Sequence, residues 1–286
     1  MTAGTLSGMS GRQSGTWQMH AVKYADRNAR VRGDSFLYDD NHDAPHAMDY
    51  FMWLLRDGDR VILVDTGYDH QEAKLRGRPI RLDPGEALAP FGLTPEQITE
   101  VIVTHLHYDH AGGLALFPNA HLHMQAAEMA FATGPCMCHD TLRAPFTAGH
   151  ICEAVLRLYG GKLTFHEGDS QLAEGLSLHC LGGHSRGLQC VRVRTAAGWM
   201  VLASDGAHYY ENVLSRKPFP IVVDLEDMMQ GFERLISLAS RPELIIPGHD
   251  PLVRRLFPQD LAPHIHRLDQ GPDGGFDLSD FSEILK

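Results

Sequence analysis

Short apolar runs alternate along the chain with segments in which apolar residues recur at helical spacing. Apolar, β-branched runs bounded by turn residues are typical of buried strands. They predict strands at 48–55, 60–64, 101–103, 176–180, 189–193, 200–203 and 244–246. Helical spacing covers 125–132, 152–159 and 227–239. The alternation predicts a protein of mixed strands and helices.

Turn and cap residues add detail at two places. The turn 57–59 (Asp-Gly-Asp) separates two apolar runs, and this predicts that 48–55 and 60–64 form a hairpin. Thr94 is followed by Pro95 and by Gln97. A threonine N-cap, a proline at the first helical position and a glutamine completing a capping box indicate a helix start there.

The ends of the chain differ in composition from its middle. Residues 1–16 are rich in Gly, Ser and Thr and lack an apolar run, so we expect a disordered leader rather than a secretory signal. Residues 271–286 begin with Gly-Pro-Asp-Gly-Gly and are expected to form a tail. Between them, 17–270 contains no Pro/Ser-rich linker, which favours a single domain. No apolar stretch approaches the roughly 18 residues of a membrane span.

Charge and cysteine content narrow the function classes. The chain has 286 residues with 25 Lys+Arg against 36 Asp+Glu, a net charge of −11 that argues against a nucleic-acid partner. Its five cysteines are scattered and do not resemble a disulfide framework, so we expect reduced thiols and a cytoplasmic protein. Eighteen histidines are many for this length, and histidine is the commonest side-chain ligand of transition metals.

Four ligand-type residues stand directly after the strand predicted at 101–103, in the run Thr-His-Leu-His-Tyr-Asp-His-Ala-Gly-Gly. Side chains alternate in extended chain, so His105 and His107 point the same way and can bind one ion together. Where the chain turns, Asp109 and His110 can face a second ion. Imidazole and carboxylate without thiolate suit Zn²⁺ in a catalytic site, although Mn²⁺, Fe²⁺ or Co²⁺ accept the same ligands.

This run resembles the HxHxDH signature of the metallo-β-lactamase superfamily, and the resemblance extends over about residues 48–250. It implies an αββα sandwich, in which two mixed β-sheets lie between helices and the metal site lies at one edge. It also implies that Asp65 supports the site and that Asp205 bridges two ions, unlike the classical zinc β-lactamases. The implied ligands of the first ion are His105, His107 and His184, and those of the second are Asp109, His110 and His249.

Two such ions, about 3.5–4 Å apart, would lower the pKa of a bridging water and give hydroxide at neutral pH. The hydroxide would attack an electrophilic carbonyl, with the oxyanion and the leaving alkoxide stabilised by the ions. Asp109 would orient the nucleophile or carry a proton to the leaving oxygen. The reaction class is therefore metal-assisted hydrolysis of an ester, thioester, amide or phosphodiester.

Within the superfamily the chain resembles the N-acyl homoserine lactonases, in its metal run, in its Gly-Gly-His-Ser turn and in 205–212. Those lactonases carry a tyrosine three positions after the bridging aspartate, where this chain has His208, with Tyr209 following. Either His208 or Tyr209 is expected to contact the substrate carbonyl. We therefore predict a dinuclear lactonase acting on an acyl homoserine lactone, and so in quorum quenching, or on another small lactone.

Other functions remain open at this point. A glyoxalase II-like thioesterase shares the ligands but has a C-terminal helical region, and only 37 residues follow His249 here. A ribonuclease Z-like enzyme would prefer a basic surface, and di-iron redox relatives have Glu where His107 stands. A non-catalytic metal-binding protein is a further alternative. In related lactonases an insertion comparable to 131–160 covers the site and contributes to a homodimer, but an ordinary peripheral helix pair explains it equally well.

Overall fold

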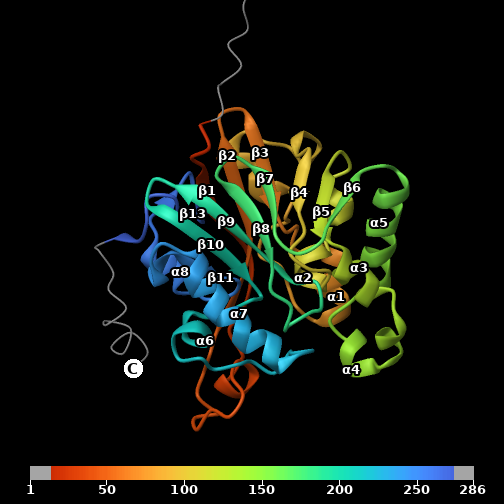
Figure 1. Ribbon diagram of the computed structural model, residues 1–286, viewed down its shortest axis with the longest axis vertical. Helices are drawn as coiled ribbons and strands as arrows, with labels where there is room; N and C mark the ends of the chain where they lie inside the picture. The colour runs from red at the N-terminus through yellow and green to blue at the C-terminus, as the bar shows by residue number, and fades with distance from the viewer. Residues whose placement is uncertain (1–13, 274–286) are drawn as a thin grey trace, which may run out of the picture.

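The computed structural model describes residues 14–273, in which two β-sheets pack face to face between helices (Figure 1). The expected leader and tail therefore lie largely outside the described residues. At the beginning of the described part, the backbone N–H groups of Ser14 and Gly15 donate to the Asp57 carboxylate. Within residues 14–273 no helix is long and apolar enough to cross a membrane.

The larger sheet has eight strands in the order β12-β13-β1-β2-β3-β4-β5-β6, and the smaller has five in the order β11-β10-β9-β8-β7. Strands of the larger sheet are β1 (Gln18–Arg27), β2 (Met48–Asp57), β3 (Arg60–Val64), β4 (Glu100–Ile102), β5 (His121–Gln125), β6 (Leu163–His166), β12 (Gln259–Asp260) and β13 (Ala262–Arg267). Those of the smaller sheet are β7 (Ser170–Ala173), β8 (Leu176–Cys180), β9 (Gln189–Thr195), β10 (Gly198–Ser204) and β11 (Ile245–Pro247).

Strand β2 shows why a strand of this fold is a continuous apolar run in the sequence. Successive side chains of a strand point to opposite faces of the sheet. In β2, Phe51 and Trp53 pack between the two sheets, while Met52 and Leu54 pack against the helices. Both faces are buried, so the strand is a continuous apolar run rather than an alternating one. The predicted hairpin of β2 and β3 is confirmed, with Asp57 paired to Arg60.

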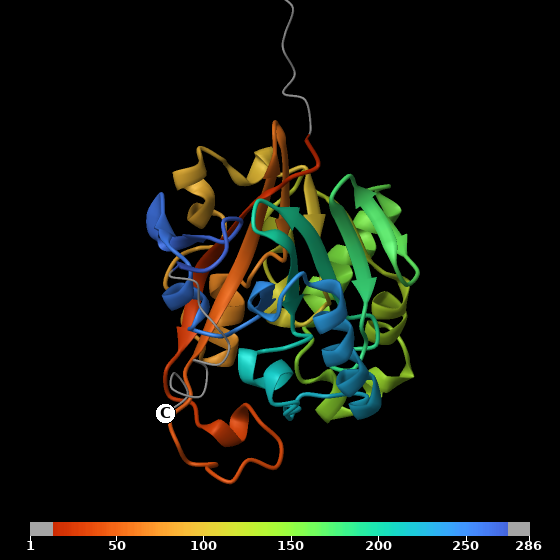
Figure 2. The same cartoon turned by 60° about the vertical axis from the view of Figure 1, so that its left-hand side comes forward.

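Helices cover the outer faces of both sheets (Figure 2). They are α1 (His70–Arg76), α2 (Tyr108–Ala111), α3 (Ala126–Ala132), α4 (Asp140–Arg143), α5 (Ala148–Tyr159), α6 (Tyr210–Leu214), α7 (Leu225–Leu238) and α8 (Val253–Leu256). Phe131 of α3 and Ala154 of α5 pack on the larger sheet, whereas Phe232 and Leu235 of α7 pack on the smaller one. The αββα sandwich is therefore confirmed.

The helix predicted to begin at Thr94 is wrong, because only a single short turn forms there. Pro95–Gln97 forms one 3₁₀ turn, and the Gln97 side chain does accept a hydrogen bond from the Thr94 N–H, as in a capping box. Ile98 then returns to extended backbone, at φ −78° and ψ 107°, and the chain enters β4. The capping signal is real, but the strand that follows leaves no room for a helix.

An ion-pair network fixes the long loop 28–47 between β1 and β2, which projects at the bottom of Figure 2. Arg32 donates to the carboxylates of Asp39 and Glu211, and Lys217 lies 3.1 Å and 2.8 Å from the same two groups. The Arg32 hydrogen bonds hold the pKa of Asp39 well below its usual range. This stabilisation is present at neutral pH and is lost as the pH falls through the acid range.

We expect Arg32→Met to accelerate amide hydrogen exchange in 28–47 by about tenfold at pH 7, because hydrogen bonds to charged groups contribute about 1.5–3 kcal/mol. Exchange followed by mass spectrometry measures the effect. Arg255→Met is the control, since Arg255 is exposed and has no ion pair within residues 14–273. Equal exchange in the two variants would show that the network does not hold the loop.

Candidate metal centre

The strands that lead into the candidate site run parallel to one another within each sheet, and their ends meet at one edge of the sandwich. β3 is parallel to β4, β10 is parallel to β11, and β8 is antiparallel to β9, which is antiparallel to β10. The candidate metal-site residues follow these ends: Asp65 after β3, His105 to His110 after β4, His184 after β8, Asp205 after β10 and His249 after β11. The structure thus brings together residues that lie up to 184 positions apart in the sequence, from Asp65 to His249.

The Asp205 carboxylate lies at the middle of the cluster. Its Oδ1 is 3.2 Å from His110 Nε2 and 3.0 Å from His249 Nε2. Its Oδ2 is 3.1 Å from His184 Nε2 and 3.8 Å from His105 Nε2. One oxygen therefore faces each of the two expected ligand groups.

The other nitrogen of several rings is fixed by an oxygen outside the cluster. Nδ1 of His184 hydrogen bonds to the Ile221 carbonyl at 2.7 Å, and Nδ1 of His249 to the Asp49 carbonyl at 2.9 Å. Nδ1 of His110 lies 2.8 Å from Asp65 Oδ2. Such partners set the tautomer of a ligating histidine, and here they turn each Nε2 inward.

The residues present fit divalent ions. Nε2 of His105, His110 and His184 and Oδ1 of Asp205 are fully buried and form no hydrogen bond within the described residues. Buried polar atoms without a partner cost free energy, and so many converging on one point are explained by ions that they coordinate. Ligand atoms of His105, His107 and His184 lie within 4.8 Å of one another, as do those of Asp109, His110 and His249.

Protonation favours the same conclusion. Burial and the neighbouring histidines lower the pKa of His105 and His107 well below the usual value, which keeps both rings neutral with a free lone pair. Burial by itself would lower the pKa of His110, but the negative charges of Asp205, Asp65 and Asp109 outweigh this effect and raise the pKa. Binding of a cation at His110 would therefore release a proton.

Asp65 supports the cluster from behind. Its two carboxylate oxygens accept hydrogen bonds from the N–H and the hydroxyl of Thr104, each at 2.8 Å, besides contacting His110. Thr104 immediately precedes His105, so Asp65 holds the beginning of the ligand loop. Asp65 itself has φ 59°, a left-handed conformation that costs a non-glycine residue energy and is typical of functional sites.

Glu128 of α3 is a site residue that sequence reasoning missed. The side chain is completely buried, and it accepts hydrogen bonds from the Leu106 N–H at 2.9 Å, the Ser185 hydroxyl at 2.5 Å and the Gly187 N–H at 2.9 Å. It thus connects the loop of His105 and His107 to the turn of His184. Gly187 permits this contact, since a Cβ there would lie 2.1 Å from the Glu128 nitrogen.

His208 and Tyr209 point to different places. His208 Nε2 lies 3.0 Å from Asp205 Oδ2, and its ring stacks on Phe219 at 3.8 Å between centroids. The Tyr209 hydroxyl instead donates to the Ala47 carbonyl and contacts the Ser35 hydroxyl. The structure therefore brings His208 to the cluster and directs Tyr209 to the loop 28–47.

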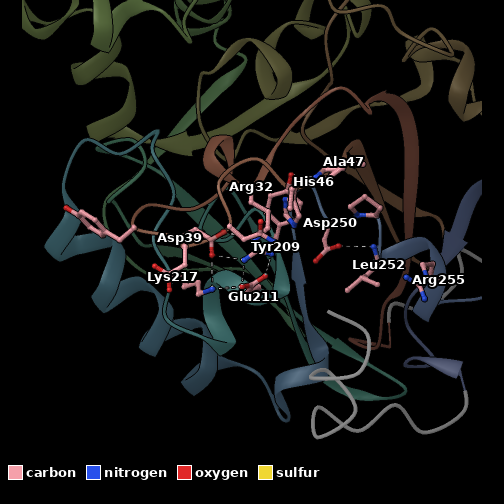
Figure 3. Close-up of a pocket in the computed structure, with 16 residues that line it drawn as sticks. Arg32, Asp39, His46, Ala47, Tyr209, Glu211, Lys217, Asp250, Leu252 and Arg255 are labelled. Carbon is pink, nitrogen blue, oxygen red and sulfur yellow. Dashed lines mark hydrogen bonds and ion pairs between the residues drawn. The ribbon is translucent and has the colours of Figure 1, made fainter. Parts of the chain in front are cut away.

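Two cavities flank these residues. The first, of about 260 Å³, reaches His107 and His184 and is walled largely by Leu142, Pro145, Pro220, Ile221, Val222 and Val223. Leu142 and Pro145 come from the segment 131–160, which therefore borders the candidate site. The second cavity, of about 670 Å³, lies between Tyr209, Asp250 and the loop 28–47 (Figure 3). No candidate metal ligand lines this second cavity. Arg32 and Lys217 in its lining are already paired with Asp39 and Glu211.

Comparison with known proteins agrees with this geometry. The family model of the metallo-beta-lactamase superfamily matches residues 49–249, and the chain belongs to this superfamily. A protein of Mycobacterium tuberculosis named "Probable metallo-hydrolase" is 26% identical over 235 residues, which are 69% of this chain and 73% of that protein.

The lactonases are similar in sequence and in fold. An N-acyl homoserine lactonase of Bacillus cereus is 29% identical over 214 residues, covering 69% of this chain and 80% of the lactonase. The crystal structure of a quorum-quenching N-acyl homoserine lactone lactonase superposes with a TM-score of 0.68 at 22% identity. It covers 84% of this chain and 95% of that one, which establishes the shared fold.

We expect Glu128→Ala to destabilise the protein by about 1–3 kcal/mol for each donor left unpaired, and to weaken metal binding by about 10–100-fold. Thermal unfolding and competition with a chromophoric chelator measure the two effects. Glu128→Gln retains part of the hydrogen bonding, so its stability and metal affinity should lie between those of the wild type and of Glu128→Ala. Glu167 is exposed, and Glu167→Ala is the control. Unchanged metal affinity in folded Glu128→Ala would restrict Glu128 to a packing role.

Proposed function

We propose that the protein is a dinuclear metal-dependent hydrolase that opens a lactone ring. The observation that carries the proposal is the convergence of buried, unpartnered imidazole nitrogens on the Asp205 carboxylate. Membership of the superfamily and the lactonases among its relatives support lactone hydrolysis, of an acyl homoserine lactone or of another small lactone. The hydrolysis of other esters or of thioesters is the alternative that the experiment below addresses.

Seven residues are proposed to hold the two ions: His105, His107 and His184 the first, Asp109, His110 and His249 the second, with Asp205 between them. Zn²⁺ is the ion proposed, since imidazole and carboxylate donors without thiolate suit it in a catalytic site, and Mn²⁺, Fe²⁺ and Co²⁺ are the alternatives that accept the same ligands. Bound ions of this kind supply a nucleophilic hydroxide at neutral pH and polarise the scissile carbonyl.

The protein's own groups handle the proton and the orientation. The Asp109 carboxylate lies 3.8 Å from His110 Nε2 and 3.7 Å from His249 Nε2. It would accept the proton given up by the attacking water and pass this proton to the leaving ring oxygen. His208 holds Asp205 by a hydrogen bond, and burial lowers the pKa of His208 to about 3. A neutral His208 would therefore donate to Asp205 and act as a positioning residue.

The first experiment is a metal count on the purified protein, combined with a pH-indicator screen of lactones, aryl esters, a glutathione thioester and a phosphodiester. About two ions per chain with lactone-selective acid release is the expected result. A preference for the thioester or the phosphodiester would reject the lactone as substrate and indicate that other class of compound instead. A folded protein that binds metal but hydrolyses none of these compounds would be a metal-binding protein rather than a hydrolase.

His107→Ala and Asp205→Ala should each abolish hydrolysis while the protein remains folded by circular dichroism, because each removes a proposed ligand. His42→Ala, an exposed histidine, is the matched control and should retain activity. Full activity in either ligand variant would reject the dinuclear mechanism.

His208→Ala should lower kcat by about 10–100-fold, the usual effect of removing a group that orients a metal ligand, with a smaller loss of metal affinity. Stopped-flow hydrolysis and chelator competition separate the two quantities. Unchanged turnover would remove His208 from the catalytic machinery and leave Asp205 oriented by its other neighbours.

A further inference from the structure

The end of α1 and the residues after it place two arginines in the lining of the metal-centre cavity. α1 ends at Arg76 and is capped by Gly77, which adopts the left-handed conformation at φ 61°. The Arg78 N–H donates to the Ala73 carbonyl and the Gly77 N–H to the Lys74 carbonyl, which is the hydrogen-bond pattern of a Schellman motif. This reversal turns Arg78 back beside Arg76, and both line the cavity that reaches His107 and His184.

The arginines of 76–81 differ in their partners. Arg76 is paired with Glu72 and also donates to the Ala144 and Phe146 carbonyls. Arg81 forms an ion pair with Asp26 at 3.0 Å on the surface. Arg78 donates only to the Tyr108 hydroxyl, and within residues 14–273 no carboxylate lies within ion-pair distance of it.

Arg78 is fixed in place although it has no counterion. Its guanidinium lies 4.9 Å from the centre of the Tyr108 ring, and the Tyr108 hydroxyl is 3.3 Å from that of Tyr50. Asp109 acts on it electrostatically, but the Asp109 carboxylate faces His110 and His249 instead. The half-buried Arg78 guanidinium therefore keeps most of its five N–H donors available to an anion that enters the cavity.

We propose that Arg78 is the anion subsite of this cavity and that the substrate is a compact lactone carrying a carboxylate besides its reacting carbonyl. The inference rests on the proposed lactone hydrolysis at the same cavity. A planar guanidinium binds a carboxylate through two parallel hydrogen bonds. One unpaired arginine among apolar walls matches a single carboxylate, whereas a phosphate group would need further donors.

The cavity also limits the rest of the substrate. Its volume of about 260 Å³ lies at the lower end of ordinary ligand pockets, and Pro145, Pro220 and Ile221 give it an apolar wall. A small ring therefore fits between the guanidinium and the histidines. The bound ring would present its carbonyl toward His107 and His184, with its carboxylate held at Arg78.

The test compares matched ligands that differ only in charge. Binding of 5-oxopyrrolidine-2-carboxylate, a lactam that resists hydrolysis, and of its neutral carboxamide is measured by calorimetry on the metal-loaded protein. The corresponding γ-lactone carboxylate and carboxamide are compared by kcat/KM. We expect the wild type to prefer each carboxylate by about tenfold or more, as hydrogen bonds between charged groups imply.

Arg78→Gln should reduce both preferences to about onefold, and Arg78→Lys should restore part of them because it keeps the charge without the planar fork. Arg81→Gln is the control, since it removes an equal charge from the same segment outside the cavity and should keep the full preference. Equal affinity of the wild type for both lactams, or a preference that survives Arg78→Gln, overturns the subsite. A preference that depends on Arg78 without hydrolysis of any lactone supports the subsite and rejects the proposed reaction.

Discussion

The position of one buried carboxylate determines the arrangement of the whole catalytic edge. Asp205 is almost fully buried, and four imidazole Nε2 atoms from three other chain segments lie within 3.8 Å of its two oxygens. Burial of a charge is tolerated only where compensating groups surround it. The strands of both sheets must therefore end together at Asp205, and this requirement ties the fold to the site.

The surroundings of the cluster serve the same constraint. Asp65 holds the loop that begins at Thr104, and Glu128 joins Leu106 to the turn at Gly187. Neither carboxylate reaches the middle of the cluster, but together they fix both sides of the loop that carries His105 and His107. This division of labour, in which outer groups orient inner ligands, is general for metal sites.

Much of this could be predicted from the sequence, because the signals were local. β2 and β3 were predicted from continuous apolar runs, and His105 to His110 from their spacing after a strand. β1 and β5 were missed because residues such as His20, Lys23 and His121 interrupt their apolar pattern. Glu128 and Arg78 were missed for another reason. Their significance lies in what their side chains meet, or fail to meet, across the fold, and no local pattern encodes that.

Charge, too, has a part that the sequence predicts and a part that depends on the surroundings of a side chain in the fold. A net charge of −11 argues against a polyanionic partner, but it says little about one small ligand. Exposed charges are screened beyond a Debye length of about 8 Å at physiological ionic strength, whereas a half-buried guanidinium acts on a ligand in contact with it. Arg78 can thus favour an anion inside an acidic protein. In the proposed subsite, selectivity for an anion would therefore depend on the single unpaired side chain of Arg78 rather than on the overall charge.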